Sequence, residues 1–268
     1  MPRAAAQSLT IVPVSAFRDN YIWLLHRGGR AAIVDPGDAV PVEAALSDLG
    51  LELDAIVLTH HHPDHTGGVI ALRDARPNHQ LAIYGPQKES IPGVTHPMTD
   101  GASMTVAGID LPCVVIEVAG HTRGHIAYYA EEMGGRYLFC GDTLFGCGCG
   151  RLFEGTAEQM QHSLARLAGL PGDTLCYCGH EYTMSNIRFA LAVDPENKNL
   201  QERSVRDQKK RDADLPTVPF TMAQECATNP FLRWDAQAVR EAAHRKNPEA
   251  TTRPADIFGA IRAWKDRF

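Results

Sequence analysis

Short apolar runs separated by turn residues characterise the first half of the chain. The runs at 11–14, 21–25 and 31–34 have the length and residue types of β-strands. Gly28-Gly29 lies between the second and third runs and predicts a hairpin turn there. The pattern therefore predicts that the chain begins with several short strands.

A helical repeat follows these strands. Apolar residues recur at i, i+3, i+4 and i+7 over positions 42–49, and Gly50 predicts the end of this helix. The next apolar run, 54–58, predicts another strand. Gly67-Gly68 then predicts the start of a second helix and would let the backbone approach a ligand closely.

The pattern changes to helix after about residue 181. Apolar positions at 184–191 have helical spacing and stop before Asp194-Pro195. The mixed-charge stretch 198–214 predicts a second helix with a solvated face. The last segment is amphipathic, with an apolar stripe of Ile257, Ile261, Trp264 and Phe268. Arg262 and Lys265 share a neighbouring face, and their spacing alone favours an ordinary solvated surface.

Composition and charge exclude some classes of protein. The 268 residues suit one large domain, or one domain with a smaller appendage, and an apolar fraction of 44% is usual for a globular protein. The net charge of −6 gives no overall basic field, so we expect no nucleic-acid partner. Residues 1–8 lack the apolar core of a signal peptide, and no stretch is apolar enough to span a membrane. We therefore expect a cytoplasmic protein with no membrane partner.

The seven cysteines agree with that location. An odd number of cysteines in a chain of this size suits a reducing compartment. Cys147-Gly148-Cys149 and Cys176-Tyr177-Cys178 lack the two-residue gap that is usual between paired cysteines in structural zinc sites. We expect buried, unreactive thiols at both motifs.

The run Thr59-His60-His61-His62-Pro63-Asp64-His65 is dense in side chains that bind divalent metals. In an extended chain His60 and His62 point to the same side. A turn at the proline would direct Asp64 and His65 to a second point nearby. The spacing therefore indicates a loop at a strand end and two metals. A solvated histidine-rich loop is the alternative, and the flanking strand and glycine signals argue against it.

Three later strands end in a similar way. Each is an apolar run that stops at a glycine followed at once by a possible metal ligand, and these ligands are His121, Asp142 and His180. Ligands placed at strand ends give a rigid site. One such residue would mean little, but three together with the histidine run indicate a single site.

These residues make a set of seven candidate ligands. The set is His60, His62, Asp64, His65, His121, Asp142 and His180. Seven donors suit two ions that share one bridging carboxylate, each ion keeping a position for solvent. Such a pair can hold a bridging hydroxide, which attacks a carbonyl carbon without a serine or cysteine nucleophile.

At this point the residues resemble a known family. The T-H-x-H-x-D-H run with its later His, Asp and His is similar to the signature of the metallo-β-lactamase superfamily. The segments 141–145, 149–156, 178–183 and 262–268 resemble the hydroxyacylglutathione hydrolases, the glyoxalase II enzymes, more closely still. The resemblance extends from about Ile11 to the last residue.

The resemblance implies an α/β protein, a metallo-β-lactamase-like αββα sandwich over residues 1–181 with a C-terminal helical substrate-binding domain over 182–268. It also implies hydrolysis of S-D-lactoylglutathione to glutathione and D-lactate, the second step of methylglyoxal detoxification. His60, His62 and His121 would hold one ion. Asp64, His65 and His180 would hold the other, and Asp142 would bridge the two. Asp64 and Asp142 would also be catalytic, with a metal-bound hydroxide as nucleophile, and the ions would be Zn²⁺, although iron or manganese also suits these ligands.

The same resemblance implies a site for the glutathione part of the substrate. Its residues would be Arg151, Tyr182, Asn186, Arg262 and Lys265. Arg151 stands where the family often has lysine, which keeps the charge, and Phe153 stands where some members have tyrosine, which removes a hydroxyl. Basic residues suit the two carboxylates of glutathione, and a thiol with a pKa of about 8.5 leaves as thiolate without a strong general acid. We expect a monomer with this small-molecule partner alone.

Other functions stay open from the sequence. The scaffold also suits a lactonase, a different thioesterase or a phosphodiesterase. A mononuclear iron persulfide dioxygenase would not need the second set of metal ligands. A metal-storage or metal-sensing module would bind zinc without thioester turnover and would not need a basic C-terminal helix.

Three residues near the candidate ligands have less certain roles. Asp35, in Asp35-Pro36-Gly37 after a strand, either orients a ligand or forms a turn. His61 lies between ligands and should point away from the metals. His125 either supports the site or packs in the core.

Overall fold

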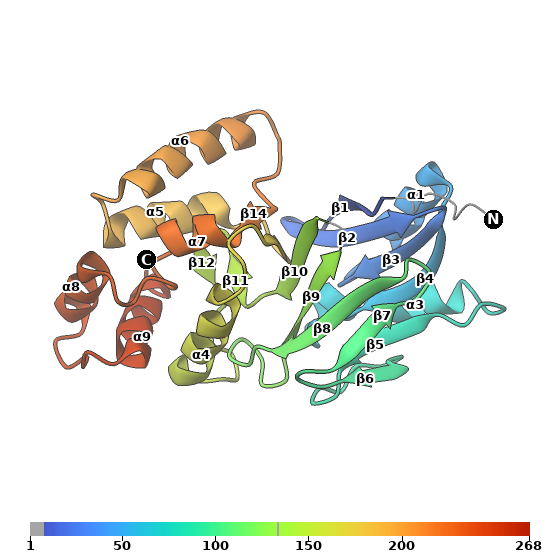
Figure 1. Ribbon diagram of the computed structural model, residues 1–268, viewed down its shortest axis with the longest axis horizontal. Coiled ribbons are helices and arrows are strands. Elements are labelled where there is room, and N and C mark those ends of the chain that lie inside the picture. Colours follow the sequence, from blue (N-terminus) through green and yellow to red (C-terminus); the bar gives the residue numbers. More distant parts are fainter. Residues whose placement is uncertain (1–7, 133) are drawn as a thin grey trace.

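The computed structural model describes residues 8–132 and 134–268. Residues 1–7, part of the segment that lacks a signal-peptide core, lie outside this described part. Two six-stranded sheets stack against each other, and the C-terminal helices gather at one end of the molecule (Figure 1). None of the described helices combines the length and the apolar sequence needed to cross a membrane.

The first sheet has the strand order β1-β2-β3-β4-β5-β6. Its strands are β1 (Thr10–Ala16), β2 (Asn20–Arg27), β3 (Arg30–Val34), β4 (Glu52–Val57), β5 (Ala82–Pro86) and β6 (His96–Met98). Neighbours from β1 to β3 are antiparallel, and those from β3 to β6 are parallel. The four strands predicted in the first 60 residues are confirmed, and both glycines of the predicted hairpin have positive φ.

Strand β2 shows why this sheet forms the middle of the molecule. Alternate residues of a strand point to opposite faces. Ile22 and Leu24 pack into the core under the helices, whereas Trp23 and Leu25 pack into the core between the two sheets. Because both faces are covered, the strand is apolar at successive positions instead of alternating.

The second sheet has the order β14-β13-β10-β9-β8-β7. Its strands are β7 (Ser103–Val106), β8 (Leu111–Glu117), β9 (Ile126–Glu132), β10 (Gly135–Gly141), β13 (Leu175–Cys178) and β14 (Phe220–Thr221). The three strands predicted to precede His121, Asp142 and His180 are confirmed as β8, β10 and β13. Strands β11 (Leu144–Phe145) and β12 (Gly148–Cys149) form a separate small hairpin.

Helices cover the outer faces of both sheets. They are α1 (Ala39–Leu49) and α3 (Val69–Asp74) on the first sheet, and α4 (Ala157–Ala168) beside the second. Asp38 caps the start of α1, and Gly50 ends it in the left-handed conformation with φ of 62°, as predicted. The short helix α2 (Pro63–Thr66) begins at the proline of the histidine run. The layers are thus helix, sheet, sheet and helix, the αββα sandwich expected from the resemblance.

The chain after residue 181, here called the helical half, is mainly helical, as predicted. Its helices are α5 (Thr183–Val193), α6 (Lys198–Asp212), α7 (Met222–Thr228), α8 (Gln237–Lys246) and α9 (Pro254–Lys265). Strand β14 returns from this half to pair with β13, so the helical half is joined to the second sheet. The division into domains at residue 181 stays a prediction.

The last segment differs in two ways from what its spacing alone indicated. Helix α9 ends at Lys265, so Phe268 lies beyond the helix and is 62% exposed, although its ring still lies against Trp264 and Phe189, with centroids 6.3 Å and 5.3 Å away. Arg262 is only 3% exposed, although its spacing favoured a solvated face. Periodicity indicates which residues share a face of a helix, but the segment that packs on that face, here the β11–β12 hairpin, decides whether it is buried.

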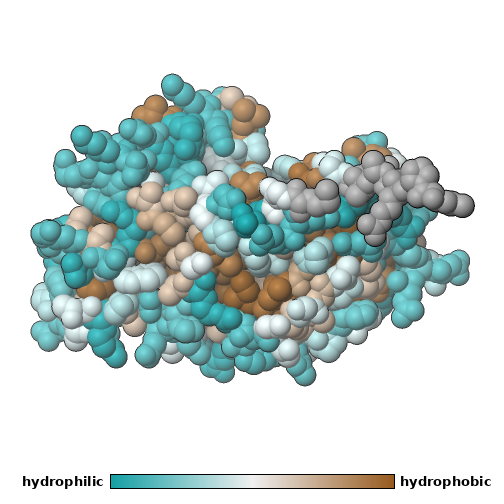
Figure 2. All heavy atoms as spheres, viewed as in Figure 1, coloured by the Kyte–Doolittle hydropathy of each residue, from teal (hydrophilic) through white to brown (hydrophobic). Residues whose placement is uncertain are grey.

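The surface of the face seen in Figure 2 is mostly hydrophilic over the helical half, and hydrophobic residues gather near the middle of the view. The four cysteines of the two C-x-C motifs are buried and free, as predicted. Burial raises the pKa of each of these thiols, which keeps them protonated and unreactive.

Candidate metal centre and substrate pocket

Three histidines meet where strands of the two sheets end. His60 and His62 follow β4 of the first sheet, and His121 follows β8 of the second. Both His60 Nε2 and His121 Nε2 lie 3.1 Å from His62 Nδ1. The structure therefore brings together the three residues that were predicted to hold the first ion.

The hydrogen bonds of these rings leave lone pairs at their meeting point. The Arg151 carbonyl, 3.0 Å from His121 Nδ1, can only accept a hydrogen bond, so that Nδ1 carries the proton. The Thr59 hydroxyl donates to a buried carboxylate and therefore accepts from His60 Nδ1. Burial lowers the pKa of both His60 and His121, so each ring is neutral with a lone pair on Nε2. The lone pairs of His60 Nε2 and His121 Nε2 are both directed at His62 Nδ1, which carries at most one proton and so can donate to only one of them. A cation bound among the three nitrogens would satisfy all of them.

Asp64, His65 and His180 form a second group beside the first. An oxygen of Asp64 lies 3.4 Å from His180 Nε2 and 3.7 Å from His65 Nε2. Asp35 contacts the opposite nitrogen, Nδ1, of His65 at 3.0 Å. Asp19 does the same for His180 at 2.8 Å. These carboxylates direct both Nε2 atoms inward, and the residues predicted for the second ion lie together.

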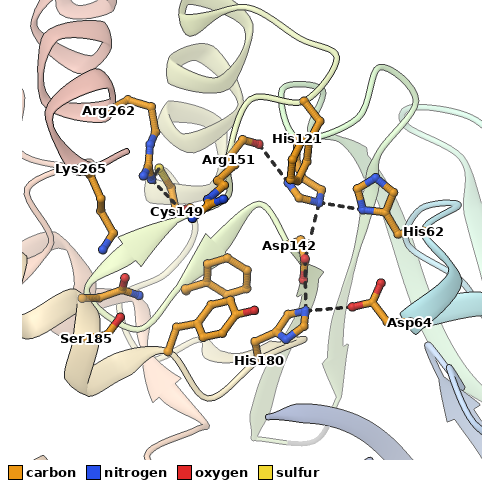
Figure 3. A pocket seen from close by; sticks show the side chains of 14 residues that line it. His62, Asp64, His121, Asp142, Cys149, Arg151, His180, Ser185, Arg262 and Lys265 are labelled. Atoms are coloured by element: carbon orange, nitrogen blue, oxygen red, sulfur yellow. Dashed lines mark hydrogen bonds and ion pairs between the residues drawn. The ribbon is translucent and has the colours of Figure 1, made fainter. Parts of the chain in front are cut away.

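Asp142 lies between the two groups (Figure 3). Its Oδ2 is 3.5 Å from His121 Nε2 and 3.3 Å from His180 Nε2. Its Oδ1 is 3.4 Å from His65 Nε2, and neither of these two buried atoms has a hydrogen-bond partner among the described residues. Buried polar atoms are normally paired, so this position suits a carboxylate that binds two cations.

The charges of the second group also favour a cation. Burial lowers the pKa of His65, but the carboxylates of Asp142 and Asp35 outweigh it and raise that pKa well above its usual value. Burial is outweighed in the same way at His180, where Asp142 and Asp64 raise the pKa to about 10. The raised pKa values mean that the surrounding carboxylates favour positive charge at His65 and His180. Protons on these rings supply that charge, and a divalent ion bound to the neutral rings would supply it equally. The donor set therefore fits two divalent ions.

Two neighbouring residues support the ligands from behind. Asp35 accepts hydrogen bonds from the Thr59 backbone and hydroxyl as well as contacting His65, so it fixes the orientation of a candidate ligand. His125 is buried, accepts a hydrogen bond from the Asp142 amide at 3.1 Å and stacks on His60. The alternative roles are present as well, because Gly37 N donates to Asp35 O at 2.9 Å in a turn and His125 is 0% exposed.

His61 points away from the two ligand groups, as predicted. Its Nδ1 lies 2.9 Å from Glu89 Oε2, and its Nε2 lies 3.4 Å from Glu154 Oε1. Glu89 also accepts hydrogen bonds from Thr122 and Gly124 in the loop that carries His121. His61 therefore helps to join the loops that surround the site.

A cavity of about 620 Å³ opens beside the two groups. It is bordered by candidate ligands and also by all five predicted substrate residues, Arg151, Tyr182, Asn186, Arg262 and Lys265. Figure 3 shows Arg262, Lys265 and Ser185 across the cavity from His62, Asp64 and Asp142. The cavity thus has a metal-binding side and a basic side.

The predicted substrate residues differ in how freely they face the cavity. Asn186 is buried and donates to the Gly146 carbonyl at 3.0 Å. Arg262 donates to the Cys149 carbonyl at 3.1 Å and contacts Asp266 at 2.9 Å.

Arg151 and Lys265, the two other cationic residues of the predicted set, have fewer partners than Arg262. Arg151 is exposed and Lys265 is half-buried, and neither forms an ion pair with any described residue. Burial, and next the guanidinium of Arg262, lowers the pKa of Lys265 to about 8. Tyr182 borders the cavity and stacks on His180 with ring centroids 4.7 Å apart.

Comparison with known proteins identifies the family. Residues 16–180 match the model of the metallo-beta-lactamase superfamily, and residues 181–268 match that of the hydroxyacylglutathione hydrolase C-terminus. A protein from Alkalilimnicola ehrlichii named hydroxyacylglutathione hydrolase is 53% identical over 96% of this chain and 98% of its own. One from Nitrosomonas eutropha with the same name is 48% identical over 97% and 99%.

The chain belongs to the hydroxyacylglutathione hydrolase family. The family and fold class predicted from the motifs are therefore confirmed, as is the expectation of an enzyme of this family.

Solved structures agree on the fold. The B3 metallo-beta-lactamase BLEG-1 matches with a TM-score of 0.61 and 24% identity, over 84% of this chain and 99% of its own. TTHA1623, solved in a di-iron-bound form, matches with a TM-score of 0.57 and 26% identity, over 83% and 100%. The αββα sandwich of the hydroxyacylglutathione hydrolase family is thus shared with these proteins.

Two residues beside the site were missed in the sequence. Asp19, which contacts His180, and Asn20, which donates to Asp64 at 3.0 Å, lie in the turn and at the start of β2. This turn pairs with the end of β13, where Tyr21 donates its amide to the Gly179 carbonyl. A polar pair at a turn is an ordinary turn signal, and only the pairing across about 160 residues gives it a role.

Replacing Asp19 with alanine should weaken one of the two metal sites. Without the carboxylate, His180 Nδ1 loses the partner that directs Nε2 inward, and such losses lower metal affinity about 10- to 100-fold. Titration of metal-free protein with zinc should show one weakened equivalent and one unchanged. Asp19→Asn, which keeps an acceptor oxygen, should have a smaller effect. Two unchanged equivalents in Asp19→Ala would contradict this role.

Proposed function

We propose that this chain hydrolyses the thioester bond of S-D-lactoylglutathione to glutathione and D-lactate with two divalent metal ions, zinc in the first place. The observation that carries the proposal is the pair of adjoining ligand groups, joined by Asp142, on one side of a cavity whose other side is basic. His60, His62 and His121 would hold one ion, and Asp64, His65 and His180 the other.

The relatives support both parts of the proposal. Those most similar over nearly the whole chain are named hydroxyacylglutathione hydrolases, and TTHA1623 is described in a di-iron-bound form. When bound, two divalent ions would supply hydroxide at neutral pH and neutralise the charge that develops on the thioester oxygen. Histidine and carboxylate ligands also accept iron or manganese.

The charge distribution of the chain suits an anionic substrate bound from the helical side. Residues 182–268 carry 15 Lys and Arg against 12 Asp and Glu, whereas residues 1–181 carry 11 against 20. Lys265 and Arg151 can each bind a carboxylate of glutathione across the cavity from the metal ligands. With the carboxylates bound there, the thioester would extend toward the metal side.

The leaving group requires little from the protein. A thiol with an ordinary pKa of about 8.5 departs as thiolate near neutral pH without a strong general acid. The phenol of Tyr182 borders the cavity, and burial raises its pKa above the usual value, so its hydroxyl stays protonated and can donate a hydrogen bond to the substrate. An amide or phosphate leaving group would need a stronger acid than the cavity offers.

Substrate binding should weaken above pH 8. With its pKa lowered to about 8, Lys265 is charged below that pH and loses its charge as the pH rises through it. A lost charged hydrogen bond of about 1.5–3 kcal/mol corresponds to a rise in KM of about tenfold or more. KM should be measured between pH 7 and pH 9.5. Lys265→Arg, charged throughout this range, should not show the rise, and an identical rise in both proteins would contradict the role of Lys265.

The decisive test is hydrolysis by the purified protein with metal content measured on the same sample. We expect S-D-lactoylglutathione to be cleaved far faster than simple lactones or phosphodiesters, with about two metal ions per chain. Comparable rates on lactones would favour another hydrolase. Zinc binding without thioester cleavage would favour a metal-storage or metal-sensing protein.

A further inference from the structure

The turn between β11 and β12 is held by the helical half of the chain. Residues 146–149 comprise this turn and strand β12 and are called the hairpin turn from here on; they follow Asp142 and precede Arg151, so they join the metal side of the cavity to its basic side. Each of the four residues forms a hydrogen bond through a backbone group to a different side chain of the helical half. These bonds are Asn186 Nδ2 to Gly146 O, Cys147 N to Glu225 Oε2, Asn229 Nδ2 to Gly148 O, and Arg262 Nη1 to Cys149 O.

The conformation of the hairpin turn leaves little room for movement. Cys147 has φ of 58°, a left-handed conformation that residues other than glycine rarely adopt. A Cβ added at Gly148 would overlap the Asn186 side chain, so backbone and side chain are in direct contact there. Such a turn keeps its shape only where the surroundings hold it.

Displacement of the hairpin turn would reach both sides of the cavity. Gly150 donates its amide to Thr143 at 3.2 Å, and a Cβ on Gly150 would overlap the Asp142 carbonyl. The next residue, Arg151, accepts from His121 Nδ1 through its carbonyl and carries one of the free cationic side chains. The hairpin turn therefore sets the distance between the carboxylate-binding groups and the metal ligands.

Glu225 is the charged member of the group that holds the hairpin turn. Its side chain is 0% exposed, and its Oε2 accepts from both the Cys147 amide and Asn229 at 2.9 Å. Its Oε1 lies 2.6 Å from Nη1 of Arg203, which is also buried and contacts Asp207 at 3.1 Å. Because desolvation offsets the attraction within a buried ion pair, the pair of Glu225 and Arg203 contributes little net stability. Its contacts with the hairpin turn are therefore the better indication of its role.

We propose that Glu225, paired with Arg203, is a positioning residue for the substrate pocket that acts through the hairpin turn. The effect on catalysis rests on the proposed thioester hydrolysis, whereas the effect on the hairpin turn does not. Without the carboxylate, Cys147 N loses a charged acceptor and Asn229 loses the partner that directs it at Gly148. The side of the cavity formed by Cys149 and Arg151 then shifts relative to the candidate metal ligands.

Asp207 provides a matched control. It contacts the same guanidinium, is similarly buried and, among the described residues, forms hydrogen bonds with Arg203 and Arg206 but none with the hairpin turn. Asp207→Asn and Glu225→Gln remove the same charge from the same network. If the network only stabilises the helices, the two variants should behave alike. If Glu225 positions the pocket, only Glu225→Gln should affect it.

The test compares the full-length protein with these two variants by hydrogen exchange, steady-state kinetics and metal analysis. In Glu225→Gln we expect faster amide exchange in residues 142–152 and a KM for S-D-lactoylglutathione raised about 10- to 100-fold, with a smaller change in kcat and unchanged metal content. In Asp207→Asn we expect exchange and KM like those of the original protein. Equal exchange and equal KM in both variants would overturn the proposal.

Asn229→Ala keeps the proposal testable if Glu225→Gln does not fold. This change removes the donor to Gly148 while the ion pair stays in place, and it should raise exchange and KM in the same direction. Unchanged exchange of residues 142–152 in Asn229→Ala would overturn the positioning role. A failure of the original protein to cleave the thioester would instead overturn the proposed function, because the exchange measurement requires no activity.

Discussion

Replacing Asp142 with alanine is expected to remove nearly all thioester hydrolysis, by a factor on the order of 10³ or more, and to lower the metal content. Asp142 is the carboxylate that lies within reach of both ligand groups, with Oδ2 3.5 Å from His121 Nε2 and 3.3 Å from His180 Nε2. Without it, the two groups keep only neutral imidazoles and Asp64. Like positive charges would then be poorly compensated at short separation. Metal analysis and kcat should be measured on the same preparation.

A matched variant separates the loss of charge from the loss of shape. Asp142→Asn keeps the size of the side chain and one oxygen, so it should retain more metal than Asp142→Ala while still losing most activity. His125 donates no ligand but accepts from the Asp142 amide, and this contact survives both changes, so the loop should stay in place. Full activity in Asp142→Ala with one bound ion would exclude the two-metal model.

Replacing Arg262 with alanine is expected to raise KM about 10- to 100-fold and to lower the free energy of unfolding by about 2–3 kcal/mol. The resemblance of the sequence implied that Arg262 helps to bind the substrate. In the structure Arg262 is also the donor to the buried Cys149 carbonyl. Its removal leaves that carbonyl without a partner and loosens the wall of the cavity that carries Arg151. Denaturant unfolding and steady-state kinetics measure the two effects separately.

Two further variants define the role of this side chain. Arg262→Lys keeps the charge but cannot bind Cys149 and Asp266 together, since lysine lacks the planar fork of donors, so its KM should be intermediate. Asp266→Ala removes the exposed partner of Arg262, and a surface ion pair is worth at most about 1 kcal/mol, so KM should change little. Equal effects of Arg262→Ala and Asp266→Ala would show that the hydrogen bond to Cys149 is unimportant.

The candidate metal ligands could be recognised in the sequence because their chemistry is local. His60, His62, Asp64 and His65 lie within one short run after a strand, and strand ends bring later ligands to the same edge. The structure places all seven candidate ligands in two adjoining groups. Their roles as ligands stay a prediction until metal is measured.

The residues behind the ligands could be predicted only in part. Asp35 was considered because it follows a strand and precedes Pro-Gly, and it does contact His65. Asp19 and Glu225 gave no such signal. Each acts on a segment far away in the sequence, Asp19 on His180 and Glu225 on Cys147, and periodicity carries no information about such partners.

By itself, then, the sequence determined the strands that lead to the site, the mainly helical part after residue 181 and the set of candidate metal ligands. These depend on hydrophobic periodicity and on residue chemistry, which are both local properties. Only the tertiary structure decided that Arg262 is buried against Cys149 while Lys265 remains half-buried with a lowered pKa, and that the helical half holds the turn between Asp142 and Arg151. Burial and long-range hydrogen bonds depend on which surfaces meet when the chain folds, and a single sequence does not specify those meetings position by position.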